Sequence, residues 1–209
     1  MFLIYKISTY LLIPVFFLIL CFRIIFKKET LESLCQKIFP QETLNFKKDN
    51  CIWFHAASIG EALSIFPIIN DIKKNRKNIF ILITTNTLSS AKIVKQKIKI
   101  YEDIDHKFFP LDNPMIIKKF LDIWKPKLAI FVDSEIWPNF LSILKGRDIK
   151  LVLLNARITN KTLNRWKYIK SSAKIIFNYF DLCLPCSNES EENLKQIGVN
   201  KIKYIGNIK

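Results

Sequence analysis

Glu61 is the residue of this sequence best suited to acid–base chemistry. It follows a short apolar run, Cys51 to Phe54, and stands three residues after Ser58, which is the spacing of a helix capping box. Two interpretations are open. Glu61 is either a cap that only satisfies backbone N–H groups, or a general base, since the first turn of a helix favours a charged carboxylate that can accept a proton. The neighbouring Gly60 lets a ligand approach the backbone there.

Polar residues of the kinds that bind ligands also follow the other apolar runs. Because the carboxyl ends of parallel strands meet at one edge of a sheet, we expect these residues to converge with His55, Ser58 and Glu61 on one cleft. They are Thr84 and Thr85 after residues 79–83, Asp133 and Glu135 after 128–132, Asn155 and Arg157 after 150–154, and the final run from Gly206 to Lys209, with Trp137 a few residues beyond Glu135.

Each of these residues also has a plainer interpretation. Trp137 and Pro138 are equally suited to loop packing, Arg157 to a surface charge, and Asp133 to capping a turn. The spacing of the residues alone does not choose between these roles and ligand binding.

The elements that must position these residues follow a strand–helix alternation. This alternation predicts an α/β fold with a Rossmann-like open parallel sheet and helices on both faces. There is no GxGxxG motif and the chain has only four glycines, so a dinucleotide-binding fingerprint is absent. We expect strands at 51–54, 79–83, 108–110, 128–132, 150–154, 182–184 and 201–205, and helices at 29–39, from 62, at 89–98, 114–124, 162–177 and 187–197.

The N-terminal residues have the composition of a membrane segment. Residues 2–22 are almost entirely apolar with Lys6 the only charge, and Arg23 begins a basic stretch directly after them. We expect a membrane-anchor helix at 1–26 with the body of the protein in the cytoplasm. Because Pro14 kinks a helix, a segment lying in the membrane surface is the alternative. The remaining parts are then a short helix and connector at 27–50 and the Rossmann-like domain at 51–209.

The formal net charge of +15 suggests an anionic partner, such as nucleic acid, an acidic membrane surface or an acidic ligand. Biased composition is the alternative, because lysine far outnumbers arginine and Ile and Asn are abundant throughout. The sequence contains neither an Arg-rich tract nor an RNP-like aromatic motif, so we expect no nucleic-acid partner.

The five cysteines include one CxxC pair, Cys183 and Cys186. A second CxxC is missing, and His55 and His106 are distant in sequence. We therefore expect both thiols to be reduced and free of metal, and we predict no metal site.

Several runs stand together in a recognisable order. They are HAASIGE at 55–61, TT at 84–85, SEIWPN at 134–139, NAR at 155–157 and GNIK at 206–209. In order and spacing, and in the apolar N-terminus, the sequence resembles the N-terminal domain of bacterial 3-deoxy-D-manno-octulosonic acid (Kdo) transferases, which are lipopolysaccharide glycosyltransferases. The resemblance covers essentially the whole chain.

The resemblance implies the N-terminal, acceptor-binding half of a GT-B glycosyltransferase. The acceptor would be lipid A precursor at the cytoplasmic side of the inner membrane, the donor CMP-Kdo, and no cofactor or metal would take part. It implies that Glu61 deprotonates the acceptor hydroxyl and that Asp133 and Lys209 stabilise the transition state. The expected substrate-binding residues are His55, Ser58, Gly60, Thr84, Thr85, Glu135, Trp137, Asn155 and Arg157.

The sequence departs from the family pattern at three places. Asp133 stands where the family usually has glutamate, Ser89 or Ser90 stands where it commonly has glycine, and the chain stops at Lys209 where the family continues into its donor domain. We expect the C-terminal donor domain to be absent. The chain would then be a fragment, one part of a split pair with a separately encoded donor domain, or a non-catalytic, membrane-anchored remnant that still binds the acceptor lipid.

Overall fold

The computed structural model describes residues 2–41, 50–76 and 78–208. In this part of the chain, six strands form one parallel sheet in the order β3-β2-β1-β4-β5-β6, which confirms the predicted α/β, Rossmann-like open sheet. The strands are β1 (Cys51–His55), β2 (Phe80–Thr85), β3 (Ile104–Phe108), β4 (Leu128–Val132), β5 (Lys150–Ala156) and β6 (Leu182–Pro185).

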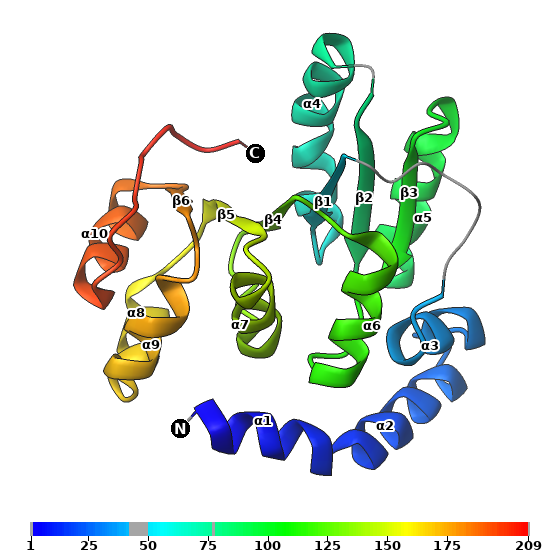
Figure 1. Cartoon of the computed structure of the whole chain (residues 1–209), viewed down its shortest axis with the longest axis horizontal. Coiled ribbons are helices and arrows are strands. Elements are labelled where there is room, and N and C mark those ends of the chain that lie inside the picture. Colours follow the sequence, from blue (N-terminus) through cyan, green and yellow to red (C-terminus); the bar gives the residue numbers. More distant parts are fainter. Residues whose placement is uncertain (1, 42–49, 77, 209) are drawn as a thin grey trace.

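Helices cover both faces of the sheet (Figure 1). Side chains alternate across a strand. Trp53 of β1 therefore belongs to the core cluster under α6, α7, α9 and α10 on one face, whereas Phe54 belongs to the cluster under α4 and α5 on the other. These helices are α4 (Ile59–Asn75), α5 (Leu88–Lys97), α6 (Pro114–Trp124), α7 (Pro138–Gly146), α8 (Asn160–Lys167), α9 (Lys170–Phe177) and α10 (Asn188–Ile197), with a short 3-10 helix at Ile98–Ile100.

Four sequence-based expectations about these elements need correction. Strand β3 lies at Ile104–Phe108 rather than at 108–110, and α7 was not expected. The expected helix at 162–177 is divided into α8 and α9, although neither Gly nor Pro marks the break. The expected strand at 201–205 is reduced to one bridge between Cys183 and Ile202.

The N-terminal residues form two helices instead of the expected single helix at 1–26. Helices α1 (Phe2–Leu11) and α2 (Ile13–Ile25) meet at Leu12 with a bend of 53°. Pro14 lies in the first turn of α2 and has no N–H to donate to the preceding turn, which explains a break there. Among the described helices, none alone is long and apolar enough to cross a membrane; α1 and α2 together have the length and composition, but they are bent.

The two helices, called here the N-terminal arm (residues 2–25), are attached to the domain by polar contacts. The Tyr5 hydroxyl donates to Asp112 Oδ2 (2.7 Å), and the Asn139 side-chain amide donates to Thr9 Oγ1 (3.1 Å). The Asn113 side-chain amide donates to the Thr9 carbonyl oxygen (3.3 Å). The arm therefore runs along the domain below α6 and α7 (Figure 1).

Helix α3 (Leu31–Ile38) connects the arm to the sheet. Thr30 and Ser33 form a reciprocal capping box at its start. The Lys37 ammonium bonds the buried Glu29 carboxylate (Nζ to Oε1, 2.6 Å) and the backbone oxygen of Asn86 just after β2 (3.0 Å). Burial lowers the pKa of Lys37 even though Glu29 opposes the shift. These bonds fix α3 beside the carboxyl end of β2.

Candidate active site

The candidate site lies where the strand order reverses. The chain passes from β1 outward to β2 and β3, then returns to β4 on the other side of β1. His55 at the end of β1 is in register with Thr84 of β2 and Phe131 of β4. In open α/β sheets, ligands bind outside the carboxyl ends of the strands at such a switch point. Glu61, in the first turn of the helix after β1, and Glu135, in the loop after β4, follow the two strands that meet at this point.

A chain of hydrogen bonds crosses this edge of the sheet. The Trp53 indole N–H donates to Thr84 Oγ1 (2.9 Å), and His55 Nδ1 lies 3.0 Å from the same oxygen. His55 Nε2 lies 3.2 Å from Glu135 Oε2, which also accepts from the Trp137 indole N–H (2.8 Å). The chain therefore joins β1, β2 and the loop after β4 through side chains from the sheet interior to its rim.

Glu135 is the carboxylate at the end of this chain. Burial by itself would raise the pKa of Glu135, but the hydrogen bonds from His55 and Trp137 and the attraction of His55 outweigh it, so the pKa lies below the usual 4.5. Since an ionised carboxylate only accepts, His55 donates to it through Nε2. The carboxylate thereby fixes the orientation of the imidazole.

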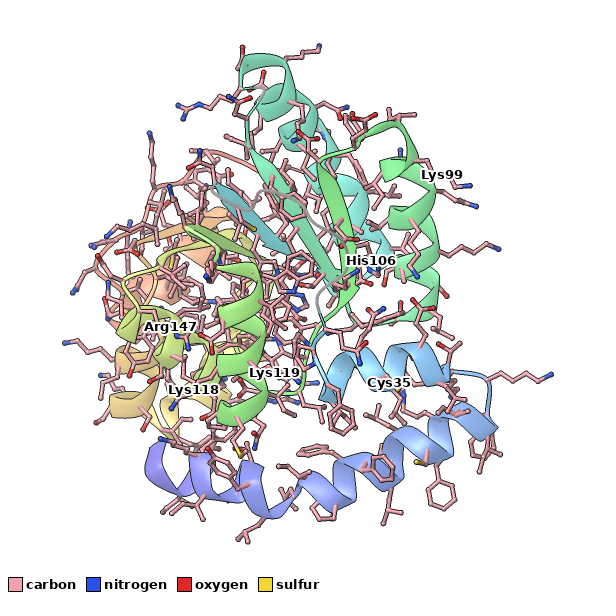
Figure 2. The ribbon with its side chains drawn as sticks, turned by 45° about the vertical axis from the view of Figure 1, so that its right-hand side comes forward. Cys35, Lys99, His106, Lys118, Lys119 and Arg147 are labelled. Carbon is pink, nitrogen blue, oxygen red and sulfur yellow. The ribbon has the colours of Figure 1, made fainter. Side chains whose placement is uncertain are left out.

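His55, Thr84 and Thr85 have side chains without solvent-accessible surface. Thr85 Oγ1 bonds His106 Nε2 (2.9 Å) on the neighbouring β3 (Figure 2), where burial, with Lys95 and Lys107 nearby, lowers the pKa of His106 to about 3. The three residues lie under the rim and bond other protein groups. Their expected contact with substrate stays a prediction.

Glu61 lies in the first turn of α4 and is 8% exposed. The Ala57 backbone N–H donates to Glu61 Oε2 (2.8 Å), and the Ser58 hydroxyl donates to Oε1 (2.6 Å). Ser58 is the N-cap of α4, and Gly60 is exposed beside it. Glu61 thus accepts bonds from the turn before α4, as a cap does, and its expected role as a base stays a prediction. They occupy two of the roughly four lone-pair sites of a carboxylate, so capacity for a further proton donor remains.

Asp133 is held in the left-handed backbone region, with φ 66°. Its backbone N–H donates to the Leu154 carbonyl oxygen (2.9 Å). The Ser134 hydroxyl bonds Asp133 Oδ1 (3.2 Å) and the Arg157 carbonyl oxygen (2.7 Å). A non-glycine residue at positive φ costs free energy and persists only where its surroundings impose it. Here the hydrogen bonds between the loops after β4 and β5 hold Asp133 at this positive φ.

Asn155, near the end of β5, and Arg157, just after it, have different surroundings. Asn155 is buried, has φ 57°, and accepts from the Ile208 backbone N–H through Oδ1 (3.2 Å). The exposed Arg157 lies at the rim. The final described residues therefore return to the same edge of the sheet. Lys209 lies outside the described residues, so its expected place beside Glu61 stays a prediction.

Asp112 was not expected from the sequence, and it positions one side of the site. It accepts from the backbone N–H groups of Asn139 (3.2 Å) and Phe140 (2.9 Å) at the start of α7, as well as from Tyr5. Burial raises the pKa of Asp112, although these hydrogen bonds oppose the shift. The one signal in the sequence is an acidic residue just before Asn113 and Pro114, which indicates only a local turn.

A cavity of about 300 Å³ separates the N-terminal arm from this edge of the domain. Phe16 and Leu20 of α2 line one side, whereas Trp137 and Asn86 line the other, and Arg23 is also in contact with it. The arm therefore borders the candidate site. Within the described residues, no group of three His, Cys, Asp or Glu side chains could hold a metal ion.

The sequence profile of one protein family matches residues 32–209. The family is described as 3-deoxy-D-manno-octulosonic-acid transferase (kdotransferase). The chain belongs to this family. The resemblance inferred from the residues is thereby confirmed.

Two curated members of the kdotransferase family illustrate the match. The 3-deoxy-D-manno-octulosonic acid transferase of Rickettsia bellii is 31% identical over 207 residues, which are 98% of this chain and 48% of the relative. The Rickettsia felis protein of the same name is 38% identical over 159 residues, 76% of this chain and 33% of the relative. The chain thus spans half or less of the length of these relatives.

A solved structure supports the fold. UDP-N-acetylglucosamine 2-epimerase from Rickettsia bellii aligns with a TM-score of 0.53 at 16% identity, covering 76% of this chain and 45% of that protein. At this identity the likeness concerns the Rossmann-like fold alone.

Proposed function

We propose that this chain is the acceptor-side half of a GT-B kdotransferase of lipopolysaccharide biosynthesis, which transfers Kdo from CMP-Kdo to lipid A precursor. Family membership and the placement of Glu61 at the switch point of the sheet support this proposal. The donor-binding half would come from a further domain, because the chain spans only 48% of the Rickettsia bellii relative.

In the proposed reaction, Glu61 is the general base. It accepts the proton of the acceptor sugar hydroxyl, whose oxygen attacks the anomeric carbon of Kdo. The bond between that carbon and the phosphate oxygen of CMP breaks, with inversion at carbon. Since the transition state separates charge, Asp133 and Lys209 would stabilise it electrostatically. The Ser58 hydroxyl and the Ala57 N–H hold the Glu61 carboxylate in a fixed orientation for this step.

His55 and Thr84 would act by positioning in this scheme. Their side chains are buried and bond one another and Glu135, so they fix the rim on which Glu135 and Trp137 stand. We propose that Glu135, Trp137, Asn155 and Arg157 border the acceptor sugar, and that the arm keeps this edge at the inner membrane on the cytoplasmic side. The exposed apolar residues of the arm support that location.

The Glu61→Gln variant tests the proposed base. In a transfer assay with CMP-Kdo, lipid A precursor and a supplied donor domain, we expect transfer to fall about 10²–10⁴-fold, because the amide cannot take a proton. The matched control is Glu189→Gln, since Glu189 also lies in the first turn of a helix, α10. Acceptor binding should persist in both variants. Near-native transfer by Glu61→Gln would show that Glu61 is a helix cap and not the base.

A second candidate is a membrane-associated protein that binds acceptor lipid without catalysis. It is favoured by the engagement of both Glu61 oxygens in the cap. Acceptor binding without transfer, in the presence of a donor domain that is active with the corresponding half of a relative, would support this candidate over the enzyme.

A further inference from the structure

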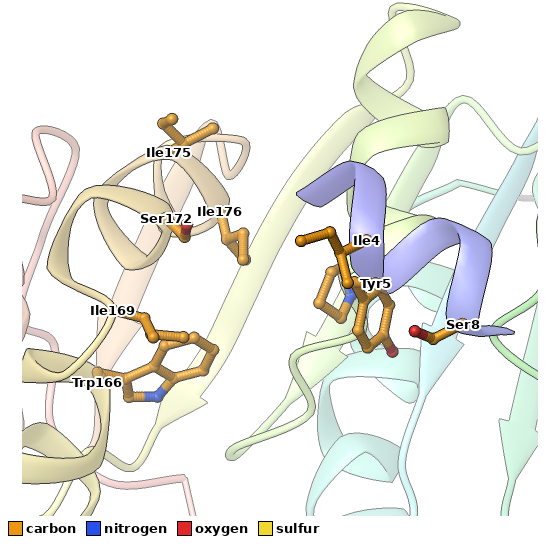
Figure 3. A pocket seen from close by; sticks show the side chains of 9 residues that line it. Ile4, Tyr5, Ser8, Trp166, Ile169, Ser172, Ile175 and Ile176 are labelled. Carbon is orange, nitrogen blue, oxygen red and sulfur yellow. The ribbon is translucent and has the colours of Figure 1, made fainter. Parts of the chain in front are cut away.

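An apolar groove of about 440 Å³ lies between α1 and the α8–α9 pair. Figure 3 shows Ile4 and Tyr5 of α1 facing Trp166, Ile169 and Ile176 across it. The polar side-chain groups of this lining are the hydroxyl groups of Tyr5, Ser8 and Ser172 and the indole N–H of Trp166. A ligand that matches this surface needs a large apolar part and few hydrogen-bonding groups.

The groove is open to the outside, because Ile4 and Ile175 in its walls are 67% and 58% exposed. The arm also carries exposed apolar side chains outside the groove, among them Leu11, Phe22 and Ile25, which are more than half exposed. An open apolar groove beside further exposed apolar side chains is typical of an interaction site.

The two chain segments that form most of the groove are basic. Residues 149–180 contain no Asp or Glu, and neither do residues 1–28. The exposed cations of the two helices on one side are Lys161, Arg165, Lys167, Lys170 and Lys174, and Lys6 stands on α1 opposite them. The Glu189 carboxylate bonds the Asn160 backbone N–H (3.2 Å), at the other end of α8 from Trp166. Both sides of the groove therefore belong to helices that carry exposed cations and no acidic residue.

We propose that this groove takes one hydrocarbon chain of an acidic membrane phospholipid, whose phosphate lies among the surrounding ammonium groups. A hydrocarbon chain matches the apolar lining, and the anionic headgroup layer of a bilayer matches the basic border. Nucleic acid would satisfy the cations but offers nothing for the lining. The proposal shares the membrane location of the proposed function but does not depend on transfer chemistry.

Fluorescence quenching of Trp166 tests the hydrocarbon part. The full chain is mixed with phosphatidylcholine vesicles containing phosphatidylglycerol, with or without bromine on the phosphatidylglycerol chains. We expect brominated chains to quench a tryptophan signal that the Trp166→Phe variant lacks, because Trp166 lines the groove whereas Trp53 and Trp124 are fully buried. Equal fluorescence of Trp166 with brominated and ordinary lipid would overturn the proposal, and this measurement needs no other variant.

Two neighbouring serines provide a matched pair for occupancy. Ser172 lines the groove, whereas Ser171 is exposed on the same helix and does not. We expect Ser172→Phe to fill the groove and remove most of the Trp166 quenching, and Ser171→Phe to leave it intact. Full quenching in a folded Ser172→Phe variant, as judged by circular dichroism, would place the lipid elsewhere.

Charge reversal tests the headgroup part. We expect Lys170→Glu with Lys174→Glu to weaken vesicle binding at least about tenfold, since each cation near an acidic bilayer contributes substantially to binding. The control of equal net charge is Lys92→Glu with Lys99→Glu; Figure 2 shows Lys99 at the α5 side of the molecule, away from α1. An equal loss in both pairs, or binding to RNA without binding to vesicles, would contradict the proposal. If the parent chain transfers no Kdo but brominated lipid still quenches its Trp166, the result counts against the proposed function alone.

Discussion

At the scale of single residues, the buried imidazole of His55 is the centre of the candidate site. It stacks on Phe109, with the ring centroids 3.7 Å apart, and bonds Thr84 on one side and Glu135 on the other. Buried polar chains are costly unless every member has a partner, and when satisfied they fix one geometry. The rim residues Glu135 and Trp137 therefore derive their positions from buried groups beneath them.

Glu135→Gln should lower stability in a pH-dependent way. The folded pKa of Glu135 is below its ordinary 4.5. Its contribution is therefore complete above about pH 4.5 and is lost as the pH falls through the folded pKa. We expect the variant to lose about 1–3 kcal/mol of unfolding free energy at pH 6, the range for hydrogen bonds to a charged group, and progressively less below pH 4.5. Urea denaturation of the variant and the parent at several pH values measures this difference in unfolding free energy.

The matched control for Glu135 is Glu32→Gln, because the Glu32 side chain is 60% exposed and pairs with Lys95 at the surface. This variant should change stability little at any of these pH values. If Glu135→Gln is as stable as the parent at pH 6, the carboxylate does not hold His55 in place.

Much of the candidate site could be predicted from the sequence. Glu61, Asp133 and Asn155 lie at or just after strand ends, and parallel strands bring their carboxyl ends together. The depth of each side chain could not be predicted, because the burial of His55 and Thr84 depends on which neighbours fill the edge. Asp112 was missed since its bonds reach Tyr5 and Phe140, which are far from it in sequence.

At the scale of elements, Asp112 joins the arm to α7. Removing its carboxylate in Asp112→Ala leaves the first N–H groups of α7 and the Tyr5 hydroxyl without this acceptor. We expect a loss of about 1–3 kcal/mol in unfolding free energy and faster tryptic cleavage after Lys6, because the arm is less firmly attached. Urea denaturation and timed proteolysis measure the two effects.

Asp122→Ala is the control for this change, since the Asp122 side chain is 66% exposed and pairs with Arg147. It should leave both cleavage and stability nearly unchanged. Unchanged cleavage after Lys6 in Asp112→Ala would show that other contacts are enough to hold α1.

The elements that the sequence failed to predict share a cause. The hydrophobic pattern indicates which positions are buried but not where a helix breaks. It continues without interruption across the break between α8 and α9. Residues 201–205 have an apolar alternation, yet only Ile202 pairs with the edge strand β6. Helix α7 begins at Pro138, which fits the first turn of a helix but equally fits a loop.

At the scale of the whole molecule, burial divides the cysteines by reactivity. Cys51 and Cys183 are fully buried, and burial raises the pKa of Cys183 to about 12, whereas Cys35 is exposed on α3 (Figure 2). We expect a maleimide to label Cys35 of the native protein within minutes and Cys183 only after unfolding, because the thiolate is the reactive form. Mass spectrometry of labelled peptides measures this.

Cys35→Ser is the control for the labelling experiment, since it should remove the fast phase and leave the slow one. Rapid labelling of Cys183 in folded protein would contradict its burial. Zinc analysis of the same protein tests the expectation that Cys183 and Cys186 bind no metal, and stoichiometric zinc would overturn it.

The contact between Thr9 and Asn139 joins residues 130 positions apart. During synthesis at about 5–20 residues per second, roughly 6–26 s separate the two residues at the ribosome. The arm therefore emerges well before α7 exists to receive it. Throughout that interval its apolar helices have no intramolecular partner on α7, so a bilayer or a chaperone competes for them first. The order of translation thus leaves the arm accessible to other apolar partners before the domain closes onto it.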